Sequence, residues 1–361
     1  MFTDFKGGIG MKEVIKKKRL FNIELLRIIA MFFIVCHHML NYSGLGRENI
    51  VFCIVNTLVS PCVNIFVLIS GYFLVDSKFK AKKIIKLYLQ IVFYYLFCTV
   101  LFRYVFNIGI LSKEDITSIV FPILYPQEWF SICYMVLYIL SPFLNKMLHN
   151  INKKEHAGLI ITLIIFAYLQ RFPGFRSYLD FNYGYSIIWF ITLYVVAAFI
   201  KFYYKKEKHQ KYIIPFGVIA TSTIIFIFYK FQINHIYLTP LFISGEYIAY
   251  SSILVLILSI LIFILFLNID IKNEKIGKII NKCSSTTFAI YLIHSANFSR
   301  VFFENYIKQS IELFGYKLFP ITLIIIILLI FECGILVDLF RQLIEKKTKY
   351  ILDRLKCEVK R

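Results

Sequence analysis

Long apolar runs separated by short polar and basic segments are the main pattern along this chain. A run of about 20 apolar residues is long enough to cross the hydrocarbon core of a bilayer as an α-helix. The pattern therefore predicts an all-α polytopic membrane protein without a soluble domain. About ten transmembrane helices are expected, at residues 22–41, 51–75, 84–106, 129–148, 157–171, 186–204, 212–230, 247–267, 284–303 and 319–340.

The distribution of basic residues predicts the orientation of these helices. Most lysines and arginines fall in the two terminal segments and in the loops on the same side as the termini. Cytoplasmic loops carry such an excess, so we expect both termini in the cytoplasm and the protein in the plasma membrane. A transmembrane domain over 22–340 is then flanked by basic cytosolic segments at 1–21 and 341–361. Three histidines of the predicted cytoplasmic loops are expected to be solvated: His149, His156 and His209.

The composition agrees with a membrane protein and excludes several other classes. The 361 residues are 59% hydrophobic and only 17% charged, with a mean hydropathy of +0.71. The net charge of +20 does not indicate nucleic-acid binding, because the basic residues are spread over loops and termini. The eight cysteines form no C-x-x-C pair and no zinc-binding spacing with histidine, so we expect no metal site.

The first apolar segment carries polar residues that a bilayer disfavours: Glu24, Arg27 and His38. At 100° per residue, Arg27 and His38 lie about 20° apart around the helix axis and about 16 Å apart along it. Glu24 lies about 40° from His38, so all three share one face, whereas His37 points aside. Interior polar residues of this kind indicate function. The plain alternatives are an interfacial Glu24–Arg27 ion pair and a buried histidine with satisfied hydrogen bonds.

Two further pairs are candidate binding residues. Glu128 and Trp129 begin a predicted helix at its outer end, where a carboxylate and an aromatic ring suit sugar recognition. Tyr291 and His294 lie near the middle of the bilayer in a segment rich in serine and threonine. Trp129 could equally be an ordinary interfacial anchor.

Five motifs stand in a fixed order along most of the chain. The first helix carries ELLRIIA followed by a histidine pair, with ten residues between Arg27 and His38. The other segments are PCVNIFVLISGYFL at 61–74, FKAKKIIKLY at 79–88, WFSICYMVLYILSPFLN at 129–145 and FAIYLIH at 288–294. In this order, the motifs resemble the acyltransferase-3 family of membrane-bound acyltransferases.

This resemblance implies transfer of an acetyl or larger acyl group from acyl-CoA to a carbohydrate hydroxyl. The donor is expected to be cytosolic acetyl-CoA or another acyl-CoA, with no permanently bound cofactor. His38 would be the general base, since imidazole is suited to proton transfer near neutral pH. Arg27, oriented by Glu24, would lie on the donor side. The segment at 189–201 resembles members associated with capsule and exopolysaccharide synthesis.

The basic segment differs from the family pattern. Three lysines stand where arginines are usual, namely Lys82, Lys83 and Lys86. Lysine still attracts phosphate, so these residues are candidate donor-binding groups, although ordinary positive-inside anchoring explains them equally well. The proposed acceptor-binding residues are Glu128 and Trp129, together with Tyr291 and His294.

Two other functions remain open from the sequence. A transporter or flippase for a lipid-linked saccharide would also need interior charges, but the chain lacks the inverted repeat and paired broken helices of many transporters. A sensor or scaffold without catalysis would tolerate substitution of Arg27 and His38. The expected partners are the lipid bilayer, acyl-CoA and a carbohydrate acceptor, and the sequence gives no prediction of oligomeric state.

Overall fold

The computed structural model describes residues 20–46, 48–170, 174, 181–233 and 247–358, and the fold over these residues is all-helical. Helices account for 81% of the structure, and the described residues form no strand. The predicted all-α class is therefore confirmed. The helices are α1 (Phe21–Asn41), α2 (Ile50–Val59), α3 (Cys62–Leu74), α4 (Ala81–Cys98), α5 (Lys113–Val120), α6 (Trp129–Asn150), α7 (Lys153–Leu169), α9 (Ile187–Tyr203), α10 (Gln210–Ile233), α11 (Ile253–Leu267), α12 (Glu274–Ser284), α13 (Thr287–Ser295) and α14 (Asn297–Glu358).

Six of the described helices are long and apolar enough to cross a membrane. Two shorter apolar helices, α9 and α11, coincide with two more of the predicted spans. The expected span at 284–303 is not one continuous helix, because α13 ends at Ser295 and the backbone of Ala296 is extended before α14 begins. The six long spans are Phe21–Asn41, Ile50–Leu74 (α2 and α3 together), Ala81–Val105 (α4 with the π-helical segment Thr99–Val105), Trp129–Asn150, Gln210–Ile233 and Asn297–Thr348.

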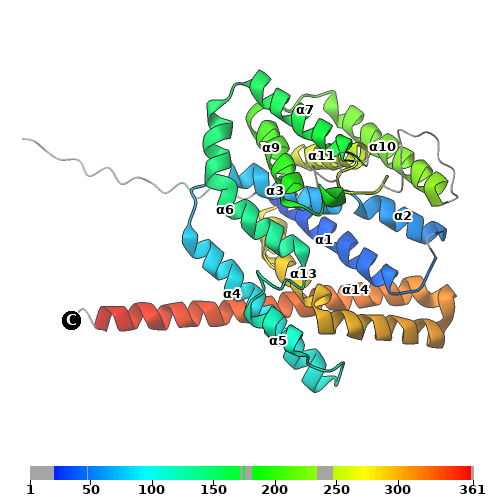
Figure 1. Cartoon of the computed structure of the whole chain (residues 1–361), viewed down its shortest axis with the longest axis vertical. Coiled ribbons are helices and arrows are strands. Elements are labelled where there is room, and N and C mark those ends of the chain that lie inside the picture. Colours follow the sequence, from blue (N-terminus) through cyan, green and yellow to red (C-terminus); the bar gives the residue numbers. More distant parts are fainter. Residues whose placement is uncertain (1–19, 47, 171–173, 175–180, 234–246, 359–361) are drawn as a thin grey trace, which may run out of the picture.

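Helix α1 runs through the middle of the bundle and packs on both sides (Figure 1). One of its faces, which includes Ile23, Leu26 and Ala30, belongs to a core shared with α3, α6, α9 and α11. Another face, which includes Val35 and Met39, belongs to a core shared with α4, α13 and α14. Because α1 joins both cores, Glu24 is buried and Arg27 and His38 are partly buried.

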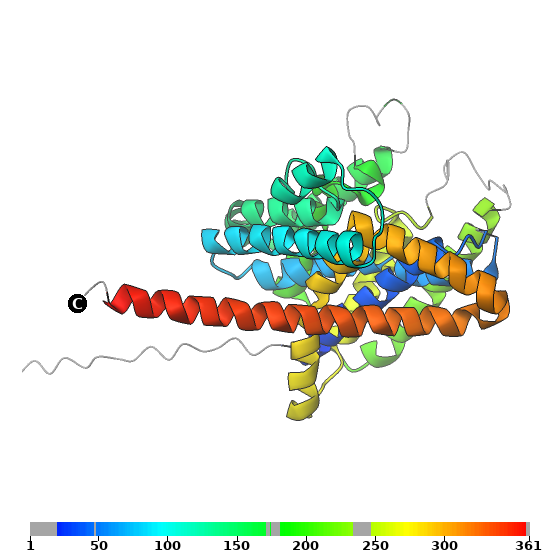
Figure 2. The same cartoon turned by 90° about the horizontal axis from the view of Figure 1, so that it is seen from below.

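Helix α14 is bent near its N-terminal end, and the segment after the bend is very long. Gly315 has a φ of +68°, a left-handed conformation that glycine adopts easily and that separates two helical segments. The second segment continues without a break past residue 340 and extends beyond the other helices (Figure 2). The predicted basic tail from residue 341 is thus a helical continuation of the last span as far as Glu358.

His156 is buried, and the expectation that it is solvated is wrong. Helix α7 begins at Lys153, capped by Asn152, so His156 lies in its first turn. Its ring is fully enclosed, with Nε2 2.9 Å from the carbonyl oxygen of Val195 and an edge-on contact to Phe199. The packing of α7 against α9 therefore removes from water a residue that hydropathy alone assigned to a loop.

Gly71 allows α3 and α9 to approach closely, as expected for a small residue between membrane helices. A Cβ atom at this position would lie 2.8 Å from the Cβ of Ala197 and 3.1 Å from the Cα of Tyr194. We expect Gly71→Ala to destabilise the protein by about 1–3 kcal/mol through overpacking. Thermal unfolding in detergent measures the change. Gly158→Ala on α7 is the control, because its Cβ would meet no atom within 4 Å, and a drop of equal size there would contradict this account.

Candidate functional site

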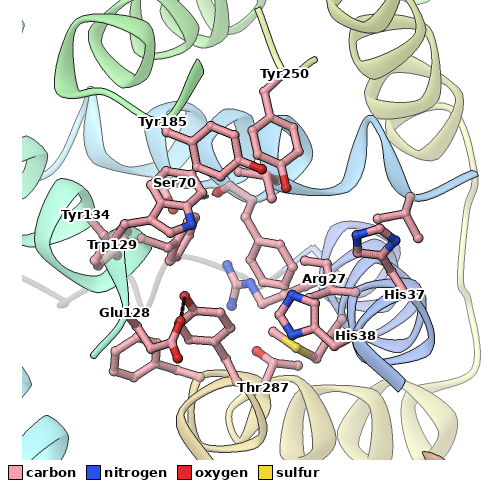
Figure 3. Close-up of a pocket in the computed structure, with 18 of the residues that line it drawn as sticks. Arg27, His37, His38, Ser70, Glu128, Trp129, Tyr134, Tyr185, Tyr250 and Thr287 are labelled. Atoms are coloured by element: carbon pink, nitrogen blue, oxygen red, sulfur yellow. Dashed lines mark hydrogen bonds between the residues drawn. The ribbon is translucent and has the colours of Figure 1, made fainter. Parts of the chain in front are cut away.

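A cavity of about 520 Å³ lies at the centre of the bundle (Figure 3). Its volume falls in the range of small-molecule binding sites, about 300–1,000 Å³. Arg27 and His38 both line it, so the two ends of the polar face of α1 open into one space. The polar and aromatic residues of the lining are Arg27, His37, His38, Asn41, Phe66, Ser70, Gln90, Glu128, Trp129, Phe130, Tyr134, Tyr185, Tyr250, Ser284, Ser285, Thr287, Phe288, Tyr291 and Arg300.

Glu24 and Arg27 form the ion pair that their spacing predicts. The Nη1 atom of Arg27 lies 2.8 Å from Oε2 of Glu24, one turn earlier on α1. Glu24 is buried, with 6% of its surface exposed, while the guanidinium of Arg27 reaches the cavity. The pair fixes the direction of the guanidinium and leaves its remaining N–H groups free to face a ligand.

His38 contacts a second histidine from a distant part of the sequence. Nδ1 of His38 lies 3.1 Å from Nε2 of His294, and the two ring centroids are 5.0 Å apart. His294 is fully enclosed and is not part of the cavity wall, whereas His38 is. Nδ1 of His294 lies 2.6 Å from the carbonyl oxygen of Ile290. His294 therefore lies behind His38 as seen from the cavity.

Glu128 and Tyr291 meet in the cavity wall. The hydroxyl of Tyr291 donates to Oε2 of Glu128 over 3.1 Å. The other carboxylate oxygen, Oε1, is buried without a hydrogen-bond partner among the described residues. An unpaired buried carboxylate oxygen is costly, and a ligand that donates an N–H or O–H group would relieve that cost. The carboxylate and the cavity together thus make a site for a polar ligand.

An aromatic wall stands next to Glu128. The ring of Trp129 lies 4.6 Å from that of Tyr185 and 6.0 Å from that of Tyr250, between centroids. Asn64 on α3 supports this wall, because it accepts from the indole N–H of Trp189 and donates to the backbone oxygen of Tyr250. Figure 3 shows Glu128 and Trp129 on one side of the cavity and the two histidines of α1 on the other.

The three candidate lysines lie outside the cavity. Lys82, Lys83 and Lys86 are exposed on the first turns of α4. Lys86 forms an ion pair of 2.6 Å with Glu345 of α14, and the ammonium of Lys83 lies 5.7 Å from the ring centroid of Tyr138. The next turn of the same helix does reach the cavity, through Leu87 and Gln90.

Nothing in the sequence marks several of the residues that line the cavity as part of a site. Tyr185 and Tyr250 come from segments between helices, and Arg300 lies in the first turn of α14. His37 was expected to point aside, yet it also lines the cavity. The reason is that the cavity covers a wide arc of α1, from His37 through His38 to Met31, about 120° of the helix surface.

The comparison with protein families covers most of the chain. A family model described as an acyltransferase domain, Acyl_transf_3, matches residues 20–337. The chain belongs to the acyltransferase-3 family. Neither a curated protein nor a solved structure gives a significant match. As a member of the acyltransferase-3 family with six long apolar helices, the protein is a membrane acyltransferase.

The matched region includes every part of the cavity. Its lining begins at Arg27 and ends at Arg300, both inside residues 20–337. An acyltransferase needs room for two substrates, a base for the acceptor hydroxyl and groups that hold the donor. The cavity brings imidazole, guanidinium and carboxylate groups and an aromatic wall together around one space.

Proposed function

We propose that this protein transfers an acetyl group from cytosolic acetyl-CoA to a sugar hydroxyl. The acceptor is a cell-envelope or exported polysaccharide, or its precursor, at the plasma membrane. The observation that carries the proposal is the single cavity into which both His38 and Arg27 of α1 project. With both termini in the cytoplasm, Arg27 lies toward the cytosol and His38 toward the outside.

His38 acts as the general base in this proposal. Its ring nitrogen takes the proton of the acceptor hydroxyl while that oxygen attacks the carbonyl carbon of the thioester. The C–S bond then breaks, an O–acetyl ester is formed, and the coenzyme A thiolate receives the proton from the imidazolium. No other reactant is needed, and His38 ends in its starting state.

The donor occupies the end of the cavity near Arg27. The cavity lining also includes polar side chains on α4 and at the α12–α13 junction, namely Gln90, Ser284 and Ser285. Such groups suit the two amides of a pantetheine arm. Lys82, Lys83 and Lys86 lie one to two turns before Gln90 on α4, where their charges attract the phosphates of the nucleotide end.

The acceptor binds against Glu128 and Trp129, with Tyr291 holding the carboxylate. Oε1 of Glu128 accepts a hydrogen bond from a sugar hydroxyl that does not react, and the indole ring packs against a sugar face. We expect Glu128→Ala to raise the acceptor KM about tenfold or more, since a hydrogen bond to a charged group contributes about 1.5–3 kcal/mol. The donor KM should stay within twofold. Equal increases in both KM values in steady-state kinetics would contradict this assignment.

Deletion of the gene and its complementation test the proposed reaction against transport. Both the amount of surface polysaccharide and its content of alkali-labile acetyl groups are measured in each strain. The proposal expects an unchanged amount of polysaccharide whose O-acetyl groups are lost on deletion and restored by the wild-type gene. Loss of exported polysaccharide itself, with normal acetylation of what remains, would instead indicate a transporter or flippase.

A further inference from the structure

We propose that His294 is a positioning residue that sets the protonation pattern of the His38 ring. This inference rests on the proposed role of His38 as the base. It assigns to His294 no contact with either substrate, because His294 is fully enclosed and is not part of the cavity wall. His294 affects the reaction only through its contact with His38.

The chain of hydrogen bonds has only one direction when both rings are neutral. A carbonyl oxygen can only accept, so Nδ1 of His294 carries the hydrogen that it donates to Ile290 over 2.6 Å. A neutral imidazole has one N–H, so Nε2 of His294 is an acceptor. The hydrogen of the 3.1 Å contact between the rings must then belong to Nδ1 of His38. Nε2 of His38 is left with a free lone pair.

That lone pair is what a general base needs. Nδ1 of His38 is engaged with His294, so Nε2 is the nitrogen available to a ligand, and the His38 ring lines the cavity. When Nε2 takes the proton of the acceptor hydroxyl, Nδ1–H still donates to His294, whose neutral Nε2 accepts it. His294 gains and loses no proton in the cycle. The second histidine performs for His38 the orienting task that a carboxylate performs in a catalytic triad.

The local fold holds His294 firmly in this role. Ile290 and His294 are one turn apart on α13, so the acceptor carbonyl and the ring belong to the same helix. Helix α13 packs against both α1 and α4, and the thiol of Cys98 on α4 lies 3.8 Å from the carbonyl oxygen of Ile293. No ion pair with a carboxylate occurs at either ring among the described residues.

A pair of amide substitutions separates positioning from simple packing. The amide of His294→Gln reaches the former place of Nε2 and can accept from His38. The shorter amide of His294→Asn reaches only the place of Nδ1, so it keeps a bond to Ile290 and loses the one to His38. Acetyl transfer is measured in nanodiscs with acetyl-CoA and the de-O-acetylated surface polysaccharide of the host.

We expect His294→Ala and His294→Asn to lower kcat about 100-fold, a common size for loss of a correctly held base. His294→Gln should retain about a tenth of wild-type kcat or more, and the donor KM should stay within twofold in all three. Higher activity in His294→Asn than in His294→Gln would overturn the proposal, because it would mean that only the bond to Ile290 matters. So would normal kcat in His294→Ala.

Nitrogen-15 NMR of histidine-labelled wild-type protein tests the protonation pattern without any variant of His294. The His38 signals are assigned by their loss in His38→Gln. The proposal expects a proton on Nδ1 and an unprotonated Nε2, and a ring protonated on Nε2 would overturn it. If His38→Ala remains fully active, the proposed function fails. If that variant is inactive while the His294 variants are unaffected, only the present inference fails.

Discussion

Replacement of His38 by alanine is expected to lower acetyl transfer by about 10²–10⁴-fold, the contribution usual for a general base. The loss should appear in kcat, because the cavity keeps its other binding groups, and the donor KM should change little. His38→Gln should be equally inactive, since an amide fills much of the space but cannot take a proton. Transfer from labelled acetyl-CoA to polysaccharide in nanodiscs measures the effect.

His149→Ala is the matched control for this experiment. His149 is exposed near the end of α6 and lies outside the cavity, so its loss should leave transfer unchanged. Immunoblotting of membranes checks that all variants are present at equal levels. If the activity of His38→Ala is within a few fold of wild type, His38 is not the general base.

Replacement of Arg27 is expected to lower kcat/KM about 100-fold. Arg27→Lys should recover only part of the activity, because an ammonium lacks the planar fork of a guanidinium. If Arg27 binds the donor, the loss should appear as an increase in the KM for the donor. An increase confined to the acceptor KM would contradict its place on the donor side.

Stability must be separated from function at this position. Arg27→Ala leaves Glu24 buried without its ion-pair partner, which is strongly destabilising by itself, about 3–5 kcal/mol. The double variant Glu24→Gln with Arg27→Gln removes both charges and avoids that cost. It should fold at wild-type levels and still transfer acetyl groups about 100-fold less well. Recovery of full activity in the double variant would show that Arg27 is needed only to neutralise Glu24.

The part of the site that could be predicted from the sequence is the part carried by one helix. Helical geometry fixes the angles between residues of α1, so the shared face of Glu24, Arg27 and His38 follows from their spacing alone. The structure adds that this face opens into a cavity. Hydropathy likewise predicts the long apolar helices, because length and polarity are local properties of the chain.

Contacts between distant segments could not be predicted in this way. His38 and His294 are 256 residues apart in the sequence, and Glu128 and Tyr291 are 163 residues apart. Nothing in either segment alone indicates that these side chains meet. Composition did single out Tyr291 and His294 as unusual interior residues, but it could not show that one lines the cavity and the other lies behind His38.

Hydropathy also could not predict where individual helices begin and end. The extended backbone at Ala296 divides a predicted span, and the Asn152 cap places His156 inside a helix and not in a loop. Both features depend on backbone conformation and on packing against neighbours. Donor binding by Lys82, Lys83 and Lys86 stays a prediction, since these exposed residues of α4 lie outside the cavity and Lys86 pairs with Glu345.

The most direct test of the central claim is acceptor-dependent release of coenzyme A by the purified protein in nanodiscs. Labelled acetyl-CoA and the de-O-acetylated surface polysaccharide of the host are supplied together, and free thiol and polysaccharide-bound acetyl are counted. The account predicts equal amounts of both with wild type, and at least about 100-fold less of both with His38→Ala, although coenzyme A binding to that variant is retained. Equal thiol release by wild type and His38→Ala, or release without acetylated polysaccharide, would contradict it.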